Sequence, residues 1–396
     1  GSFSAASNVT GRLTDVHAIA RLLHAHDAYA CFDYAASAPY VEIDMNPPRD
    51  ADGGDASLDA VFISPHKFLG GPGATGVLVF NESLYSKELP PSVGGGGTVD
   101  YVSTTGHDFV EDIEERERAG TPGVLQTLKA ALAFELKRAV TVDAIEARER
   151  ELLERAMKRW RSNERIEILG DCDASDRIGI VSFNLRDPSG RYLHPKLVTV
   201  LLNDLFGIQS RAGCSCAGPY GHRLLGIDPA KSADFRALVH RGLEGIKPGW
   251  ARLSLPWYLS DDELDFILTA VEFVATHGID FVPLYRFNWR DGVWRHVERP
   301  APARAPIALS LDGLRELQSG PAPDRSRASM TDDDLRAERE RYFAEARDLA
   351  TRLRERWRGT QLDWNPPSGD PEVDALAWFR YVHAEGLEAG SGVSSS

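Results

Sequence analysis

The stretch from Asp59 to Gly76 reads Asp59-Ala60-Val61-Phe62-Ile63-Ser64-Pro65-His66-Lys67-Phe68-Leu69-Gly70-Gly71-Pro72-Gly73-Ala74-Thr75-Gly76. Its apolar run predicts a buried strand that delivers Ser64, His66 and Lys67 at its carboxyl end, and its glycines predict a sharp turn. Open α/β sheets bind ligands at the carboxyl ends of their strands. A lysine shielded from water there could attack a carbonyl group, and Ser64 and His66 could hold a phosphate. The alternative is an ordinary surface lysine beside a loop histidine.

Short apolar runs alternate with helical patterns over the first 120 residues. This alternation is typical of βαβ units and predicts an α/β fold with a mostly parallel sheet. Strands are expected at residues 29–33, 60–64 and 76–80, and a helix at residues 15–26.

The pattern changes after residue 120 to long helices separated by single strands. It predicts a smaller α+β domain over residues 121–285, with strands at residues 178–184 and 251–255. Residues 286–396 are expected to form a carboxyl-terminal extension with a linker and a long helix. Thr331 is a suitable N-cap for that helix, which we expect to pack on its own protein rather than on a dedicated partner.

The composition of the 396 residues excludes several classes of partner. Lys and Arg total 45 against 59 Asp and Glu, so the net charge is -14 and nucleic-acid binding is not expected. Four cysteines are too few for a disulfide framework. We find no apolar run near the roughly 20 residues that span a bilayer, and no signal peptide at the amino end. We therefore expect a cytoplasmic protein without membrane association.

Asp33 ends the apolar run that precedes the strand leading to Lys67. Pyridoxal phosphate requires such a pair: a lysine that bonds to it, and a carboxylate that keeps its pyridine nitrogen protonated. Taken alone, Asp33 would be a helix cap or a turn residue. Together, Asp33 and Lys67 make pyridoxal phosphate the expected cofactor.

Several segments, in this order and spacing, resemble one enzyme family. Ser7-Asn8-Val9-Thr10-Gly11, Asp33-Tyr34-Ala35-Ala36 and Ser64-Pro65-His66-Lys67 resemble the class V aminotransferase family of pyridoxal-phosphate enzymes, in particular its cysteine desulfurase and selenocysteine lyase branch. Later segments are similar to its Gly-Thr-Pro turn, cysteine loop and arginine strand: residues 119–122, 211–219 and 249–254. The resemblance covers roughly residues 2 to 278 and implies fold type I, with residues 1–120 as part of the large cofactor-binding domain.

The resemblance implies roles toward the cofactor for five residues. Lys67 would bond to pyridoxal phosphate and later move the α-proton of the substrate as acid and base. Asp33 would pair with the pyridine nitrogen, and Ser64 and His66 would bind the phosphate. Thr121 would reach the phosphate of the neighbouring subunit, because family members build shared active sites in a homodimer.

The resemblance also implies roles toward the substrate. Asn8 would contact the substrate carboxylate or a cofactor oxygen, and Arg252 would clamp the carboxylate with two parallel hydrogen bonds. Cys216 occupies the loop position where desulfurases hold the thiol that takes sulfur from cysteine, which gives a persulfide and alanine. Cys214 lies two residues away, so a redox couple or two inert residues is the alternative. Two cysteines are too few for a zinc site, and no metal is expected.

Three functional hypotheses follow. The first is a pyridoxal-phosphate enzyme acting on a small amino acid, of the cysteine desulfurase or selenocysteine lyase type, that serves a sulfur-acceptor protein. The second is a class V aminotransferase or epimerase for which Cys216 is incidental. The third is an inactive fragment or a subunit that needs an amino-terminal partner segment, because strands and helices precede the Asn8 motif in the family.

Overall fold

A computed structural model describes residues 1–49, 54–170, 173–214, 217–298 and 331–387. Two units can be distinguished, and the division between them falls within helix α4 (Val142–Trp160). The first unit comprises Gly1–Leu153 and Asp173–Gly179, and the second comprises Glu154–Cys172 and Ile180–Ser396. The predicted boundaries at residues 120 and 285 divide the chain differently and remain predictions.

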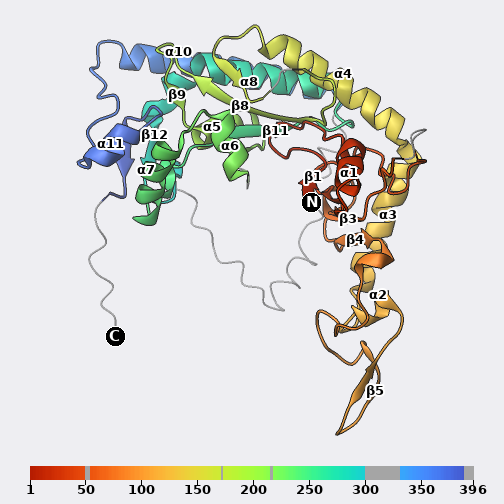
Figure 1. Cartoon of the computed structure of the whole chain (residues 1–396). Helices are drawn as coiled ribbons and strands as arrows, with labels where there is room; N and C mark the ends of the chain where they lie inside the picture. The colour runs from red at the N-terminus through yellow and green to blue at the C-terminus, as the bar shows by residue number, and fades with distance from the viewer. Residues whose placement is uncertain (50–53, 171–172, 215–216, 299–330, 388–396) are drawn as a thin grey trace, which may run out of the picture. The chain divides into compact units, whose positions relative to one another are not determined.

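A four-stranded sheet lies at the centre of the first unit (Figure 1). Its strands follow the order β1 (Ser2–Ser4), β2 (Cys31–Asp33), β3 (Ala60–Ile63) and β4 (Val77–Phe80). β1, β2 and β3 are parallel, whereas β4 runs antiparallel to β3. The predicted α/β class with a mostly parallel sheet is confirmed, and each predicted strand of this region is present with slightly different ends.

Helix α1 (Val16–His24) connects β1 to β2, as expected for a βαβ unit. It begins after Asp15, whose side chain accepts a hydrogen bond from the backbone nitrogen of Ala18 at 2.9 Å. An aspartate in this position satisfies an N–H group that has no partner within the helix. The predicted helix of this region is thereby confirmed.

The two faces of this sheet differ in burial. Residues paired across neighbouring strands point to the same face, because side chains alternate along each strand. Phe32 and Val61 form such a pair and are 0% and 1% exposed. On the other face, Phe62 and Leu78 form a pair that is 42% and 52% exposed. Parallel sheets are usually covered on both faces, so the described part of the first unit leaves one face open at Phe62 and Leu78. On the other face, Phe3 and Val79, which pair with Phe32 and Val61, are also 42% and 43% exposed.

Further elements of the first unit follow β4 along the chain. They are the 3-10 helix η2 (Glu82–Leu84), the strands β5 (Val99–Val102) and β6 (His107–Phe109), the helices α2 (Ile113–Arg116) and α3 (Val124–Val140), and the beginning of α4. Long helices were predicted after residue 120, and α3 and α4 are the first two of them. α3 buries Ala130 and Ala133. Three leucines on α3 are more than half exposed: Leu125, Leu128 and Leu132.

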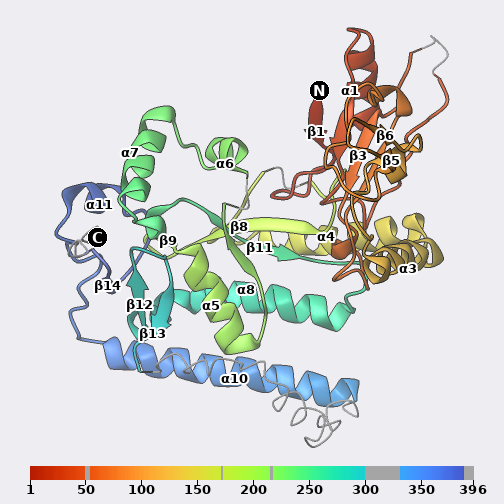
Figure 2. The same cartoon turned by 90° about the horizontal axis from the view of Figure 1, so that it is seen from below.

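The second unit is built around a separate antiparallel sheet (Figure 2). Its strands follow the order β10 (Arg211–Gly213), β11 (Trp250–Ser254), β8 (Ile180–Arg186) and β7 (Ile166–Ile168), and β9 (Tyr192–Leu193) pairs with β8. β8 is buried along residues 180–185 and so forms the centre of this sheet. A second, three-stranded sheet has the order β13 (Trp294–His296), β12 (Tyr285–Asn288) and β14 (His383–Glu385).

Helices surround these sheets in the second unit. They are α5 (Pro195–Phe206), α6 (Gly218–Leu224), α7 (Pro229–His240), α8 (Asp261–Phe281), α10 (Asp332–Trp357) and α11 (Pro371–Leu376), with the 3-10 helices η3 (Glu244–Ile246) and η4 (Val282–Leu284). α5, α8 and α10 pack against one another, and α10 runs beside α8 in Figures 1 and 2.

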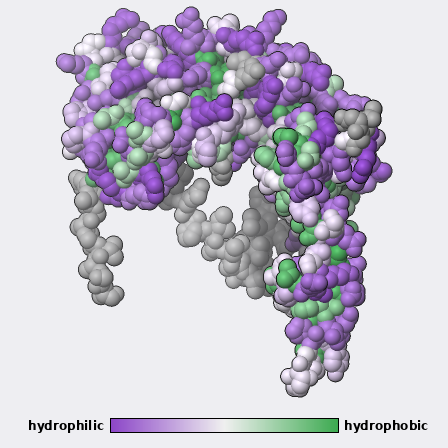
Figure 3. Space-filling model, viewed as in Figure 1, coloured by the Kyte–Doolittle hydropathy of each residue, from purple (hydrophilic) through white to green (hydrophobic). Residues whose placement is uncertain are grey.

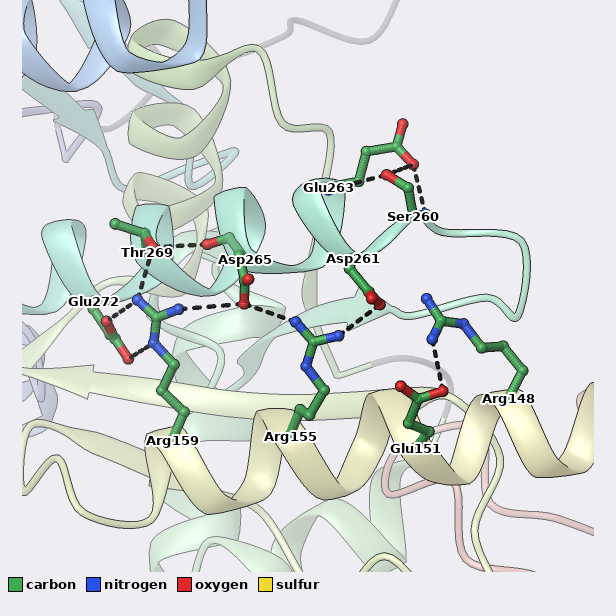
Figure 4. Close-up of polar contacts among 10 residues, drawn as sticks. All are labelled: Arg148, Glu151, Arg155, Arg159, Ser260, Asp261, Glu263, Asp265, Thr269 and Glu272. Carbon is green, nitrogen blue, oxygen red and sulfur yellow. Dashed lines mark hydrogen bonds and ion pairs between the residues drawn. The ribbon is translucent and has the colours of Figure 1, made fainter. Parts of the chain in front are cut away.

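Ion pairs join the end of α4 to α8 within the second unit (Figure 4). Arg155 bonds to Asp261 at 2.6 Å and to Asp265 at 3.0 Å. Arg159 holds Glu272 with two hydrogen bonds of 2.7 Å, a geometry that the planar guanidinium favours. Both arginines are about one-third exposed, so each pair contributes on the order of 0.2–1 kcal/mol.

The long carboxyl-terminal helix α10 begins at the predicted cap. Thr331 Oγ1 accepts a hydrogen bond from the nitrogen of Asp334 at 3.2 Å, and the Asp334 carboxylate accepts one from the nitrogen of Thr331 at 2.9 Å. Phe343 of this helix packs on Phe206 and Phe266, with ring centres 4.9 and 5.5 Å apart. The prediction that this helix packs on its own protein is confirmed.

Helix α8 corrects one expectation from the sequence. We expected no apolar run near the length of a bilayer span, but residues Asp261–Leu284 are long and apolar enough to cross a membrane by length and composition. Of the most apolar window in this segment, 61% is buried inside the protein. Such burial is typical of a core helix, whose apolar side chains pack against neighbouring elements.

Asp59, directly before β3, ties together three segments of the first unit. Its Oδ2 accepts hydrogen bonds from the backbone nitrogen of Ala30 at 2.7 Å and from His24 Nε2 at 2.9 Å. His24 Nδ1 lies 3.0 Å from the carbonyl oxygen of Asp55. The hydrogen bond to Asp59 raises the pKa of His24 above its ordinary value of 6.5, because both ring nitrogens have acceptors when the ring is protonated.

We expect His24→Gln to destabilise the protein more at about pH 5.5 than at about pH 8.5. The raised pKa means that the folded state holds the His24 proton more tightly than the unfolded state does. The stabilisation of the folded state by protonated His24 is therefore complete below about pH 6.5 and is lost as the pH rises through the folded-state pKa. Urea unfolding at both pH values measures the difference, with the exposed His26→Gln as control. Equal destabilisation at the two pH values would contradict the assigned pair.

Candidate active site

Five of the predicted site residues follow neighbouring strands at one edge of the first sheet. β1, β2 and β3 are in register at Ser4, Asp33 and Phe62. Because the three strands are parallel, the segments that follow them leave the sheet at its carboxyl edge, where α/β sheets bind ligands. The residues carried to this edge are Asn8 after β1, Asp33 at the end of β2, and Ser64, His66 and Lys67 after β3.

The chain turns sharply after β3. Pro65 begins the 3-10 helix η1 (Pro65–Lys67), and the nitrogen of Phe68 donates to the carbonyl oxygen of Pro65 at 3.0 Å. Gly71 approaches so closely that a Cβ atom there would lie 1.9 Å from the Pro65 oxygen, so only glycine fits. The turn buries the Phe68 ring against α3 and leaves Lys67 exposed at the sheet edge.

The segment after β2 holds Asp33 in a second turn. Asp33 Oδ1 accepts a hydrogen bond from the nitrogen of Ala35 at 2.7 Å, which is the turn role that the sequence left as an alternative. The nitrogen of Tyr34 donates to the carbonyl oxygen of Phe62 at 2.9 Å and continues the pairing of β2 with β3. Burial raises the pKa of Tyr34 to about 12. The buried Tyr34 thus anchors the turn while the Asp33 side chain remains exposed.

Lys137 of α3, which the sequence analysis did not single out, contacts both turns. Its Nζ donates to the carbonyl oxygens of Ala38, at 2.7 Å, and Val41, both in the segment after β2. Nζ also lies 5.9 Å from the ring centre of Phe68, in the segment after β3. Burial lowers the pKa of Lys137 to about 8. A single lysine in a helical pattern carries no sequence signal for such contacts, since they depend on how the helix packs.

Three predicted residues are not among those brought to this edge. Thr121 precedes α3 and lines a cleft of about 530 Å³. Among the described residues, no other predicted site residue lines this cleft. Arg252 belongs to β11 in the second unit, where it pairs with Arg211 of β10 and Ser182 of β8. Cys216 lies outside the described residues. The roles of these three residues remain predictions.

The described part of the cysteine loop borders a pocket in the second unit. Cys214 is exposed and lines this pocket, which has a volume of about 350 Å³. Phe235, Trp250 and His222 also line it. His222 Nε2 lies 2.9 Å from Ser232 Oγ, which holds the imidazole in place. A largely apolar pocket therefore adjoins the loop that carries the predicted sulfur-accepting cysteine.

Comparison with known sequences identifies the family. The profile of the aminotransferase class-V family matches residues 2–266. The chain belongs to this family. A probable cysteine desulfurase of Halobacterium salinarum is 29% identical to this class-V family member over 266 residues, which cover 67% of the chain and 55% of that protein. A probable cysteine desulfurase of Halalkalibacterium halodurans is 30% identical over 213 residues, 54% of the chain and 48% of that protein.

Solved structures share the fold of this class-V family member. The apo cysteine desulfurase of Thermococcus onnurineus superposes with a TM-score of 0.55 at 26% identity, covering 69% of this chain and 59% of that one. The cysteine desulfurase CsdA of Escherichia coli has a TM-score of 0.51 at 23% identity, which shows the fold alone. The predicted fold type I of pyridoxal-phosphate-dependent transferases is confirmed. The chain spans about half the length of the curated relatives that it matches.

Members of this family depend on pyridoxal phosphate, and the residues at the sheet edge fit that cofactor. The donor set contains an amine that can bond to an aldehyde, a carboxylate for a pyridine nitrogen, and a hydroxyl and an imidazole for a phosphate. These groups belong to Lys67, Asp33, Ser64 and His66. The two turns leave Asp33 and Lys67 exposed, so neither side chain is buried within the first unit.

We expect Lys137→Met to raise the Kd for pyridoxal phosphate by about tenfold. The change removes two hydrogen bonds that hold the segment after Asp33, and so loosens the support of both turns without touching the cofactor. Absorbance titration measures the Kd, and thermal unfolding shows whether the fold is retained. The control is Arg138→Met, on the same helix and exposed. An unchanged Kd in a folded Lys137→Met protein would show that Lys137 does not position these turns.

Proposed function

We propose that this protein is a pyridoxal-phosphate-dependent enzyme that acts on an amino acid, and more specifically a cysteine desulfurase-like enzyme. The observation that carries the proposal is that Asp33 and Lys67 follow neighbouring parallel strands of one sheet. Membership of the class-V family supports the cofactor. Similarity to probable cysteine desulfurases supports cysteine as the substrate.

Four residues at the sheet edge would prepare the substrate. When bound, the cofactor supplies an electron sink for charge that develops at the α-carbon of the substrate. Lys67 would bond to the cofactor, and its neutral amine, once released by the substrate, would accept the α-proton and return it. Asp33 would stabilise the proton on the pyridine nitrogen through its negative charge. Ser64 and His66 would hold the phosphate by hydrogen bonds.

Three further residues would orient the substrate and complete the site. Arg252 would bind the substrate carboxylate with two parallel hydrogen bonds. Asn8 would contact that carboxylate or a cofactor oxygen. Thr121 would reach the phosphate bound by a neighbouring subunit, so the proposed assembly is a homodimer with shared active sites. A location in the cytoplasm remains a prediction.

Cys216 would accept the sulfur of the substrate cysteine. Its thiolate attacks that sulfur, so an S–S bond forms as the C–S bond breaks. The electron pair of the C–S bond stays with the β-carbon, which takes up a proton. The products are alanine and a persulfide on Cys216, and a thiol of a sulfur-acceptor protein would then take the outer sulfur. In a class V aminotransferase or epimerase, the alternative within this family, Cys216 would play no part.

The open face of the first sheet supports a second candidate function, a subunit that needs an amino-terminal partner. Phe62 and Leu78, which pair with each other on this face, are 42% and 52% exposed, and adjoining exposed apolar side chains favour the binding of another chain. Such a subunit would bind pyridoxal phosphate weakly alone and would gain affinity when the partner covers this face.

The proposed function predicts a visible absorption band when the purified chain is incubated with pyridoxal phosphate, and release of sulfide and alanine from cysteine. Lys67→Ala should abolish both, because no other residue is proposed to bond to the cofactor. Cys216→Ala should retain the band and lower sulfide release by about 100-fold or more, as expected when a nucleophile is lost. Absorbance spectra and a sulfide assay measure the two effects, with the exposed Lys158→Ala as control.

Each result distinguishes the hypotheses. A band that does not depend on Lys67 would contradict the assigned cofactor site. A Lys67-dependent band with full sulfide release from Cys216→Ala would contradict the sulfur-accepting role of Cys216. A band that forms only after an amino-terminal segment of a relative is added would identify the subunit candidate.

A further inference from the structure

Two adjacent compartments lie within the second unit, beside the segment that carries Cys214. One is the pocket of about 350 Å³ described above, and the other has a volume of about 80 Å³. The two compartments share four lining residues and therefore adjoin each other: Leu225, Ile227, Phe235 and Pro248. Helices α6 and α7 contribute residues to their walls, so we call the two compartments together the α6–α7 pocket. Figure 3 shows apolar side chains among hydrophilic ones at the surface of the part of this unit that carries α7 and α11 in Figure 1.

The walls of the α6–α7 pocket also include residues from two strands and from the carboxyl-terminal extension. Asn184 of β8 and Trp378 line the smaller compartment, and Trp250 of β11 lines the larger one. Trp378 Nε1 donates to the carbonyl oxygen of Ile246 at 3.0 Å, which holds this indole in place. The family profile matches residues 2–266, so the wall formed by Trp378 lies outside that match. The family match therefore does not assign this pocket.

Two polar atoms in these walls have no hydrogen-bond partner among the described residues. They are Asn184 Oδ1 and Trp250 Nε1. Asn184 is 2% exposed and Trp250 is 1% exposed, so bulk solvent does not replace the missing partners. A buried polar atom without a partner destabilises the folded state. A ligand that donates a hydrogen bond to Asn184 and accepts one from Trp250 would remove this destabilisation.

The charged side chains that line the pocket favour an anion. Among the described lining residues, Lys231, Arg236 and Lys247 are cationic and none carries a carboxylate. Arg236 is exposed, and its Nε donates to His240 Nε2 at 3.2 Å. Lys231 Nζ lies 6.0 Å from the ring centre of Phe235 in the shared wall. A negatively charged group is therefore favoured beside this apolar wall, whereas the ammonium group of an amino acid is disfavoured.

We propose that the α6–α7 pocket binds a small aromatic carboxylate that has a hydroxyl group on its ring. The ring packs against the shared wall, because apolar and aromatic side chains suit a flat apolar ligand. The hydroxyl group donates to Asn184 Oδ1 in the smaller compartment. The carboxylate accepts a hydrogen bond from Trp250 Nε1 in the larger compartment, where Arg236 and Lys247 balance its charge. The larger compartment lies at the low end of the roughly 300–1,000 Å³ that is typical of ligand pockets, so the ligand is small.

This inference does not depend on the proposed enzymatic function. None of the described residues assigned to the cofactor or to the amino-acid substrate lines the α6–α7 pocket. Titration in the presence of excess pyridoxal phosphate separates the two sites, because a ligand that entered the candidate cofactor site would be displaced.

The test is isothermal titration calorimetry of the full chain with excess pyridoxal phosphate. We expect 4-hydroxybenzoate to bind saturably, with a Kd at least about tenfold lower than that of 4-methylbenzoate, which lacks the hydroxyl group, or of 4-methylphenol, which lacks the carboxylate. Asn184→Leu should abolish the preference for hydroxyl over methyl, because Oδ1 is removed. The same change should raise the midpoint of thermal unfolding of the ligand-free chain, because an apolar group replaces a buried polar atom that has no partner.

Arg236→Met keeps the test decisive if Asn184→Leu fails to fold, since the Arg236 side chain is exposed. It should raise the Kd of 4-hydroxybenzoate by about tenfold and leave the binding of 4-methylphenol unchanged. The matched control is Arg223→Met, which changes an exposed arginine of α6 that does not line the pocket. The proposal is overturned if 4-hydroxybenzoate does not bind, as expected if water alone fills the pocket. It is also overturned if either analogue binds equally tightly, or if Arg223→Met weakens binding as much as Arg236→Met does.

Discussion

The parallel pairing of β2 with β3 is the constraint on which the candidate site depends. It places Asp33 level with Phe62, so a carboxylate and a lysine from separate parts of the chain leave the sheet at the same edge. A slip of one residue would turn Asp33 to the opposite face. The slip would also turn the fully buried Phe32 of the same strand to the other face, at a cost of roughly 1.5–3 kcal/mol for a large apolar side chain. Burial of Phe32 thus favours the register that places Asp33 and Lys67 at the same edge of the sheet.

The two turns that follow these strands position the side chains of Asp33 and Lys67. After β3, the close approach of Gly71 to Pro65 and the burial of Phe68 leave Lys67 outside the turn. After β2, the buried Tyr34 anchors a turn that uses one oxygen of Asp33. Lys137 contacts both turns from α3, and its ammonium group, which is charged below its pKa of about 8, is stabilised by hydrogen bonds to two carbonyl oxygens.

Much of this site could be predicted from the sequence because its signals are local. An apolar run, a following glycine run and a carboxylate after the preceding strand are sufficient for Asp33, Lys67 and the turn at Gly71. The contacts of Lys137 could not be predicted, since they join residues about 100 positions apart through packing of α3. Phe62 was not predicted to lie on an exposed face, because alternation along a strand does not reveal which face another element covers. Helix α8 shows the same limit, since composition does not distinguish a core helix from a bilayer span.

Borohydride reduction of the chain in the presence of pyridoxal phosphate, followed by peptide mapping with mass spectrometry, tests the central claim most directly. Reduction makes the bond between the cofactor and its lysine permanent, so the labelled peptide identifies the residue. The account predicts a single major label, on Lys67. A major label on Lys137, on Lys129 or on a lysine of the second unit would contradict the claim that the carboxyl ends of β2 and β3 form the cofactor site.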